Sequence, residues 1–193
     1  MSGLLDLEKQ LTFYGAYHHN KVNIAIHIIC VPLILFSFFE ILSNFGPFFH
    51  LPSWLPTVPY LNANLGTFAA MMWGGLYVLL EPVAGTALAL ICLGVTAWCN
   101  YLRLEDPTGT VTKVAIGLHV ISWLAQFVGH GKYEGRAPAL LDNLFQAIFL
   151  APLFVWLEVL FAIGYRPELK SRVDRAVADE IAKFRARKEK KGQ

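Results

Sequence analysis

The sequence predicts an all-helical integral membrane protein with about four full transmembrane helices and a broken fifth apolar segment. Of its 193 residues, 55% are hydrophobic and only 16% are charged, which is far from the composition of soluble domains. Several apolar stretches are long enough to cross roughly 30 Å of hydrocarbon, and proline, glycine or charged residues separate them. We therefore expect the lipid bilayer to be part of this protein's solvent.

The first predicted membrane segment covers residues 24–44 and is almost wholly apolar. Its length is sufficient to cross the hydrocarbon layer as a helix. Pro32 is expected to kink this helix, and Glu40 needs a partner or a position at the membrane interface. The connection that follows cannot form one continuous helix because it contains four prolines, namely Pro47, Pro52, Pro56 and Pro59.

Two further apolar segments, residues 65–80 and 83–102, are predicted to form a helical hairpin. Glu81 and Pro82 mark the boundary between them, because proline disfavours helical backbone in the residue before it. The first segment is short for a membrane span, about 24 Å at helical rise. Its small residues would allow the two helices to approach closely, and they are Ala69, Ala70, Gly74 and Gly75.

The last two apolar segments run from Val111 to Gly131 and from Asn143 to Tyr165. The former is uncharged through most of its length, so we expect a full crossing. The latter contains Pro152 and Glu158, and we expect it to break near Ala151 into a re-entrant or interfacial hairpin.

Charge is distributed unevenly along the chain. The whole sequence carries +2, but residues 166–193 contain ten Lys/Arg and five Asp/Glu. Basic segments tend to stay on the cytoplasmic side of a membrane, where they can bind anionic lipid. We therefore predict a membrane-embedded domain over residues 1–165, a basic cytoplasmic tail over residues 166–193, and a cytoplasmic amino terminus. No nucleic acid partner is expected.

Histidines near both ends of the predicted membrane domain are the candidate metal ligands. His130 and Glu134 are four residues apart, so on a helical turn both side chains reach a common ion. His18 and His27 are nine residues apart, about 13 Å on a straight helix, which is too far to share a metal. A bend over residues 20–23 would bring these two imidazoles together.

The remaining histidines rank lower as ligands. His119 precedes His130 by eleven residues in one apolar stretch, about 16 Å on a helix, so we interpret it as a packing or supporting residue. His19 would point away from its neighbour His18 in a regular segment. His50 lies among prolines, on the side of the membrane that we infer to be opposite. Ionisable groups at membrane depth are costly and tend to mark function, which favours a working site over chance.

Imidazoles with one carboxylate suit several metals. Two histidines and a carboxylate with open positions are typical of non-haem Fe(II) oxygenases, whereas three histidines and a water are typical of catalytic zinc. From the residues alone, Fe(II), Mn(II) and Zn(II) all stay open.

Other side chains are candidates for contacts around such a metal. Cations beside the ligands could pair with a substrate carboxylate, and polar aromatic or amide groups could bind substrate or support the ligands. The candidate substrate residues are Lys132, Arg136, Tyr14, Tyr17 and Gln126. The candidate supporting residues are Trp123 and Asn143, besides the two tyrosines and Gln126.

Two long stretches of the chain resemble a known family. They are GLLDLEKQLTFYGAYHHNKVNIAIHIICVP near the amino terminus and WLAQFVGHGKYEGRAPALLDNLFQAIFLAPLFVWLEV further on. Through them the chain resembles, over nearly its whole length, the small endoplasmic-reticulum proteins that include the fungal 2-hydroxy fatty acid dioxygenase. The resemblance implies that Fe(II) and O2 are used to shorten a 2-hydroxy fatty acid by one carbon, as in phytosphingosine breakdown. It carries the catalytic and metal-binding roles onto His18, His27, His130 and Glu134.

Two other functions stay open at this point. The histidines could satisfy one another in a membrane scaffold or lipid-binding protein that holds no catalytic metal. A zinc-dependent lipid hydrolase could use the same residues, and zinc would then support activity without O2. The repeated HxxxH and HxxHH clusters of di-iron membrane hydroxylases are absent from the sequence, which disfavours that class.

Overall fold

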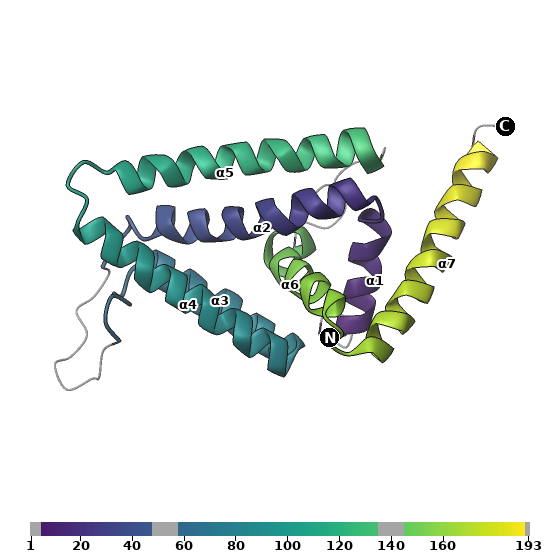
Figure 1. Ribbon diagram of the computed structural model, residues 1–193, viewed down its shortest axis with the longest axis horizontal. Coiled ribbons are helices and arrows are strands. Elements are labelled where there is room, and N and C mark those ends of the chain that lie inside the picture. Colours follow the sequence, from purple (N-terminus) through teal and green to yellow (C-terminus); the bar gives the residue numbers. More distant parts are fainter. Residues whose placement is uncertain (1–4, 48–57, 135–144, 192–193) are drawn as a thin grey trace. The chain divides into compact units, whose positions relative to one another are not determined.

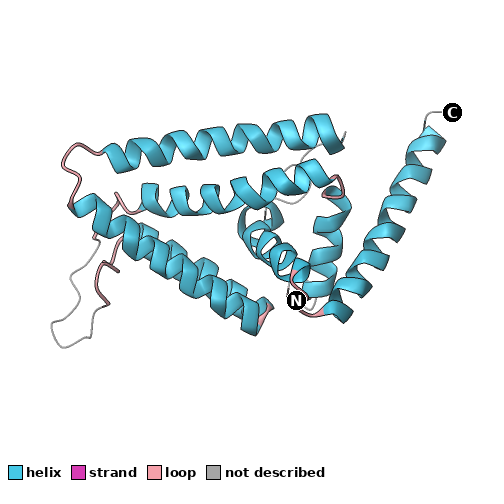
Figure 2. Cartoon of the chain, in the orientation of Figure 1, coloured by secondary structure: helices cyan, strands magenta, loops and turns pink. Residues whose placement is uncertain are grey.

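The protein, seen in a computed structural model, is described over residues 5–47, 58–134 and 145–191, and its regular elements there are all helices (Figure 1, Figure 2). This confirms the predicted all-helical class. The chain divides into two compact units, one formed by Met1–Ile28 with Phe127–Gln193 and the other by Ile29–Gln126.

Three helical stretches are long and apolar enough to cross a membrane. They are α2 (Lys21–Leu42), α4 (Pro82–Leu104), and α5 (Thr110–Val128) together with the short π-helix η1 (Gly129–Glu134) that continues it. Only 11% of the most apolar window of the last stretch is buried inside the protein. Apolar surface left uncovered to this extent is typical of helices that face lipid. The chain therefore contains several candidate membrane-spanning helices, as the composition predicts.

The predicted hairpin at Glu81–Pro82 is confirmed within the second unit. Helix α3 (Leu65–Leu80) ends one residue before Glu81, whose carboxylate accepts a hydrogen bond from the Ala84 amide at 2.5 Å and so caps α4. The two helices lie side by side (Figure 1). Gly85 makes this close approach possible, because a β-carbon there would overlap the Tyr77 carbonyl.

Glu40 has the partners that the sequence requires of a carboxylate at membrane depth. Its side chain is 2% exposed, and its Oε1 accepts a hydrogen bond from the Thr112 hydroxyl at 2.9 Å. The Arg103 Nε lies 3.8 Å from the same oxygen. These contacts offset part of the cost of burying the charge within the second unit.

The first unit contains the basic tail as a long helix. Helix α7 (Pro167–Lys191) packs against α1 (Leu7–Tyr17), and Gly15 of α1 faces Val177 of α7. Arg172 of α7 forms an ion pair with Glu8 of α1, with Nε and Oε2 3.0 Å apart. The tail thus contributes a packed helix to this unit.

The fifth apolar segment differs from its prediction in where it bends. At Ala151 a π-helix, η3 (Gln146–Leu150), passes directly into α6 (Ala151–Ala162). Pro152 lies at the first turn of α6, directly after this junction. The sharp bend, of 117°, lies instead between α6 and α7, where Gly164 and Arg166 both have positive φ angles. Counted as one bent span, this pair would raise the number of candidate crossings to four.

Candidate metal centre

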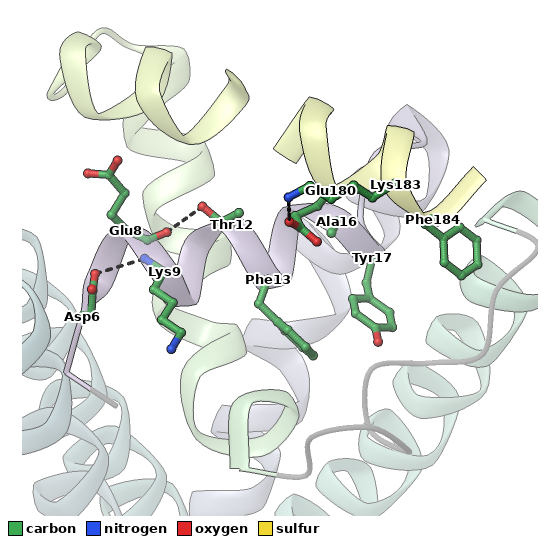
Figure 3. Close-up of a pocket in the computed structure, with 10 residues that line it drawn as sticks. All are labelled: Asp6, Glu8, Lys9, Thr12, Phe13, Ala16, Tyr17, Glu180, Lys183 and Phe184. Carbon is green, nitrogen blue, oxygen red and sulfur yellow. Dashed lines mark hydrogen bonds and ion pairs between the residues drawn. The ribbon is translucent and has the colours of Figure 1, made fainter. Parts of the chain in front are cut away.

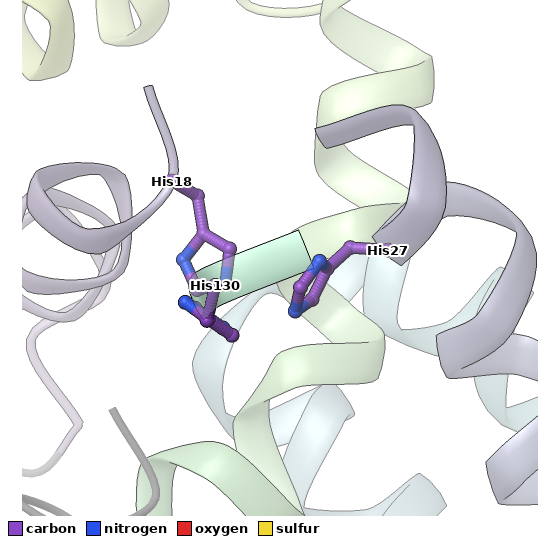
Figure 4. A group of neighbouring side chains, drawn as sticks. All are labelled: His18, His27 and His130. Atoms are coloured by element: carbon purple, nitrogen blue, oxygen red, sulfur yellow. The ribbon is translucent and has the colours of Figure 1, made fainter. Parts of the chain in front are cut away.

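Three histidines from distant parts of the chain meet in the first unit. His18 ends α1, His27 lies in the second turn of α2, and His130 lies in η1. The ring centroids are 4.4 Å apart for His18 and His27, 4.8 Å for His18 and His130, and 4.9 Å for His27 and His130. Each ring offers a nitrogen within 4.8 Å of the other two (Figure 4). These three residues are called the histidine triad below.

The turn between α1 and α2 brings His18 and His27 together. Helix α1 ends at Tyr17 and α2 begins at Lys21, so the reversal lies just before the predicted bend at residues 20–23. Asn20 supports the new helix, because its Oδ1 accepts a hydrogen bond from the Val22 amide at 2.9 Å. A polar residue of this kind satisfies one of the free amides at a helix start.

Backbone carbonyls fix the orientation of two of the three rings. The Nδ1 of His18 lies 2.8 Å from the Tyr14 carbonyl, and the Nδ1 of His27 lies 2.9 Å from the Asn23 carbonyl. Since a carbonyl oxygen can only accept, each Nδ1 must carry the proton and donate it. Each Nε2 is then left with a free lone pair, which is the usual arrangement of a metal-binding histidine.

The triad is buried and its environment favours neutral imidazoles. The exposed fractions are 8% for His18, 3% for His27 and 4% for His130. Burial, followed by the proximity of His27, holds the pKa of His18 well below its ordinary value. Among the described residues, the Nδ1 of His130 has no hydrogen-bond partner. Buried lone pairs that face one another without donors are costly, and a bound cation would satisfy them, so these residues fit a metal ion.

Glu134 lies at the turn that carries His18. Its Oε1 accepts hydrogen bonds from the His19 amide at 2.9 Å, from the Asn20 amide at 2.8 Å and from the Asn23 side chain at 3.1 Å. Its Oε2 lies 2.7 Å from His19 Nδ1. The group of nitrogens within 4.8 Å of one another comprises the histidine triad without this carboxylate. Its assignment as a metal ligand stays a prediction.

Two predicted substrate residues, Tyr14 and Tyr17, lie on α1, the helix that ends at His18. Tyr14 is buried, and its ring stacks on His18. Tyr17 is also buried and lines a pocket of about 600 Å³ between α1 and α7, together with Phe13 and Phe184 (Figure 3). Charged residues complete the lining, with Lys183 paired to Glu180 at 2.7 Å.

The other predicted residues divide into three groups. Lys132 is exposed, with its ammonium 5.6 Å from the centre of the Tyr133 ring. Gln126, His119 and Trp123 belong to the second unit. There His119 hydrogen-bonds Ser37 at 2.9 Å and accepts from Trp123 at 3.1 Å, as expected of a packing histidine. Arg136, Asn143 and His50 lie outside the described residues.

Asn23 is a residue of the site that the sequence analysis used only as part of a bend. It is fully buried, its carbonyl holds His27, and its side chain donates to Glu134. Its position four residues before His27, one helical turn, was a usable signal, because the side chain of a residue and the carbonyl one turn earlier lie on the same face.

Comparison with known proteins points to one family. The family model described as "2-hydroxy-palmitic acid dioxygenase Mpo1-like" matches residues 4–163. The chain is 38% identical over 172 residues to the 2-hydroxy-palmitic acid dioxygenase MPO1 of Saccharomyces cerevisiae. These aligned residues cover 89% of this chain and 90% of the yeast protein. No solved structure matches.

Proposed function

Because the chain belongs to the Mpo1-like dioxygenase family, we propose that it is an Fe(II)-dependent enzyme that uses O2 to remove one carbon from a 2-hydroxy long-chain fatty acid. The name of the yeast relative suggests 2-hydroxypalmitic acid as a substrate. We place the enzyme in the endoplasmic-reticulum membrane with both termini in the cytoplasm, where the basic residues 166–193 would face anionic lipid. Residues 1–165 form the catalytic domain in this proposal.

The observation that carries the proposal is the burial of three imidazoles with converging nitrogens. His18 and His27 would bind the metal through Nε2, since their Nδ1 atoms donate to backbone carbonyls. His130 would supply the third nitrogen. When bound, Fe(II) would activate O2 and hold the substrate's carboxylate and 2-hydroxyl groups.

The residues around the triad would orient the substrate and exclude water. The acyl chain would enter from the lipid along the apolar helices, since a long-chain acid partitions into the bilayer. Lys132 is exposed beside His130 and would attract the substrate carboxylate, with Arg136 as a second candidate. Tyr14 and Tyr17, both buried, would close the α1 side of the site, and we keep Gln126 as a further candidate.

The proposed reaction balances without a reductant or an organic cofactor. The bond between the carboxyl carbon and the carbinol carbon breaks, so that R–CHOH–COOH and O2 give R–COOH, CO2 and water. The substrate supplies the electrons that reduce O2. One O2 should therefore disappear for each shortened acid that forms.

The test is O2 consumption by the full-length protein, purified in detergent, loaded anaerobically with Fe(II) and given 2-hydroxypalmitic acid. We expect the fatty acid one carbon shorter as product, and a loss of at least roughly 100-fold in His130→Ala, beyond the usual effect of removing a supporting residue. His119→Ala is the matched control, because His119 bonds Ser37 and Trp123. It should retain activity.

Two results would support the rival functions. Activity with zinc in the absence of O2 would indicate a lipid hydrolase. A protein that retains no iron after anaerobic loading, although correctly folded, would indicate a scaffold or lipid-binding protein. An active His130→Ala enzyme would remove this residue from the site.

A further inference from the structure

We propose that Asn23 is a positioning residue for the histidine triad. Its backbone orients His27, and its side chain contacts Gly129 and Glu134, the first and last residues of η1, which carries His130. This inference rests on the proposed metal site and adds to it a residue that touches none of the reacting groups. It also gives Glu134 a role: the carboxylate holds the α1–α2 turn against η1.

Asn23 makes three contacts, each toward a different part of the site. Its carbonyl accepts the Nδ1 proton of His27 at 2.9 Å, and its Nδ2 donates to Glu134 Oε1 at 3.1 Å. Its Oδ1 lies against Gly129, the residue before His130, where a β-carbon would overlap this oxygen. A single residue with no exposed surface therefore contacts both His27, through its backbone, and the element that supplies His130, through its side chain.

The carboxylate of Glu134 fixes which way the Asn23 amide points. Only the amide nitrogen can donate to a carboxylate oxygen, so Nδ2 must face Glu134 and Oδ1 must face Gly129. The lack of a side chain at Gly129 leaves the room that this oxygen occupies. An aspartate at position 23 would instead bring a second carboxylate against Glu134, and like charges at this distance repel strongly in a buried site.

The same Glu134 oxygen accepts from the amides of His19 and Asn20 as well as from Asn23. The His19 amide directly follows His18 in the chain. Glu134 thereby ties the end of η1 to the turn that places His18, and Asn23 ties both to His27. Removing the Asn23 amide should let His130 move away from the other two rings without removing any ligand.

The experiment compares wild type with Asn23→Asp, Asn23→Ser and Glu134→Gln in the full-length protein in detergent. One measurement is made without metal: nuclear Overhauser effects between the ring protons of His27 and His130, in protein labelled only at histidine. The centroids are 4.9 Å apart, close enough for such effects. The other is titration with Co2+, whose visible absorption reports the number and type of its ligands.

We expect wild type to show the ring-to-ring effects and Asn23→Asp to lose them, with Co2+ bound roughly 10- to 100-fold more weakly, as for other residues that support metal ligands. Asn23→Ser keeps the backbone carbonyl but lacks the amide that donates to Glu134, so it should also weaken both signals. It provides the test if Asn23→Asp does not fold. Adding Glu134→Gln to Asn23→Asp removes the repulsion and should restore part of the affinity. Asn62→Asp makes the same change at an exposed position and should leave both signals unchanged.

Different results would contradict the positioning role of Asn23, the role given to Glu134 and the proposed function. Wild-type ring effects and Co2+ affinity in both Asn23 variants would overturn the positioning role. Loss of Co2+ binding in Glu134→Gln as complete as in His130→Ala would make Glu134 a ligand and overturn the role given to it here. Ring effects that depend on Asn23, in a wild-type protein that binds neither Co2+ nor Fe(II), would support the positioning role and contradict the proposed function.

Discussion

The imidazole of His18 stacks on the ring of Tyr14, with centroids 4.0 Å apart and an interplanar angle of 15°. The backbone carbonyl of Tyr14 also accepts the His18 Nδ1 proton. Phe154 of α6 packs on the same tyrosine, with centroids 5.0 Å apart. Tyr14 thus holds His18 through both its backbone and its ring, and transmits the packing of α6 to it.

Replacing Tyr14 should therefore affect metal binding according to what remains of the ring. Tyr14→Phe keeps the stack and the carbonyl, so we expect Co2+ affinity within about threefold of wild type. Tyr14→Leu removes the stack, and aromatic pairs contribute about 0.5–1.5 kcal/mol, so we expect affinity to fall by up to roughly tenfold. Co2+ titration measures both variants. Equal affinities for Phe and Leu would show that the carbonyl alone orients His18.

The lowered pKa of His18 predicts that the metal-free protein loses stability in mild acid. Burial keeps His18 neutral in the folded protein, whereas in the unfolded chain it takes up a proton near pH 6.5, about the ordinary value. The unfolded state then binds more protons, so the free energy of unfolding decreases as pH falls below about 6.5. We expect the melting temperature to drop between about pH 7.5 and pH 5, and to drop less steeply in His18→Gln. The same slope in both proteins would contradict this assignment.

The sequence predicted the helical class and the meeting of the three histidines, and both have simple physical reasons. Apolar runs of sufficient length, and the proline after Glu81, determine where helices begin and end in lipid. The polar residues around Asn20 permit a reversal, which brings His18 and His27 together. The eleven residues between His119 and His130 in one apolar helix were enough to distinguish a packing histidine from the candidate ligands.

The partners of Glu134 could not be predicted in the same way. Two of its hydrogen-bond donors are the backbone amides of His19 and Asn20, and a backbone amide leaves no trace in residue type. The i,i+4 spacing from His130 placed the carboxylate on the correct side of the turn but did not show what it binds. Tail packing was missed for a related reason. Charge predicted a basic cytoplasmic tail that can bind anionic lipid, whereas the contact of α7 with α1 depends on Gly15, which has no side chain to signal it.

Close packing of α3 and α4 predicts a strong effect of a single methyl group at Gly85. A β-carbon there would overlap the Tyr77 carbonyl, which belongs to the backbone and cannot rotate away. We expect Gly85→Ala to destabilise the protein by at least about 1–3 kcal/mol, the usual cost of overpacking. Thermal melting measures this. Gly75→Ala in α3 is the matched control: its β-carbon meets nothing within 4 Å, so stability should stay constant or rise slightly.

The contact between Gly15 and Val177 predicts that α7 can be detached from α1 without changing any charge. A β-carbon at Gly15 would lie 2.6 Å from Val177 Cγ2, and a β-branched side chain has little freedom to withdraw. Leu169 and Val173 are buried on α7, so Gly15→Ala should expose this face and accelerate trypsin cleavage within α7 by roughly five- to thirtyfold, corresponding to about 1–2 kcal/mol.

The compensating change identifies the contact itself. Val177→Ala removes the methyl groups that meet the new β-carbon, so the double variant Gly15→Ala/Val177→Ala should be cleaved more slowly than Gly15→Ala alone. Gly117→Ala adds the same methyl group to α5, where nothing lies within 4 Å, and should leave cleavage unchanged. If Val177→Ala gives no recovery, the α1–α7 contact does not control access to the tail. Since His18 follows Gly15 by three residues, Co2+ affinity in the same variants measures how far α7 docking supports the metal centre.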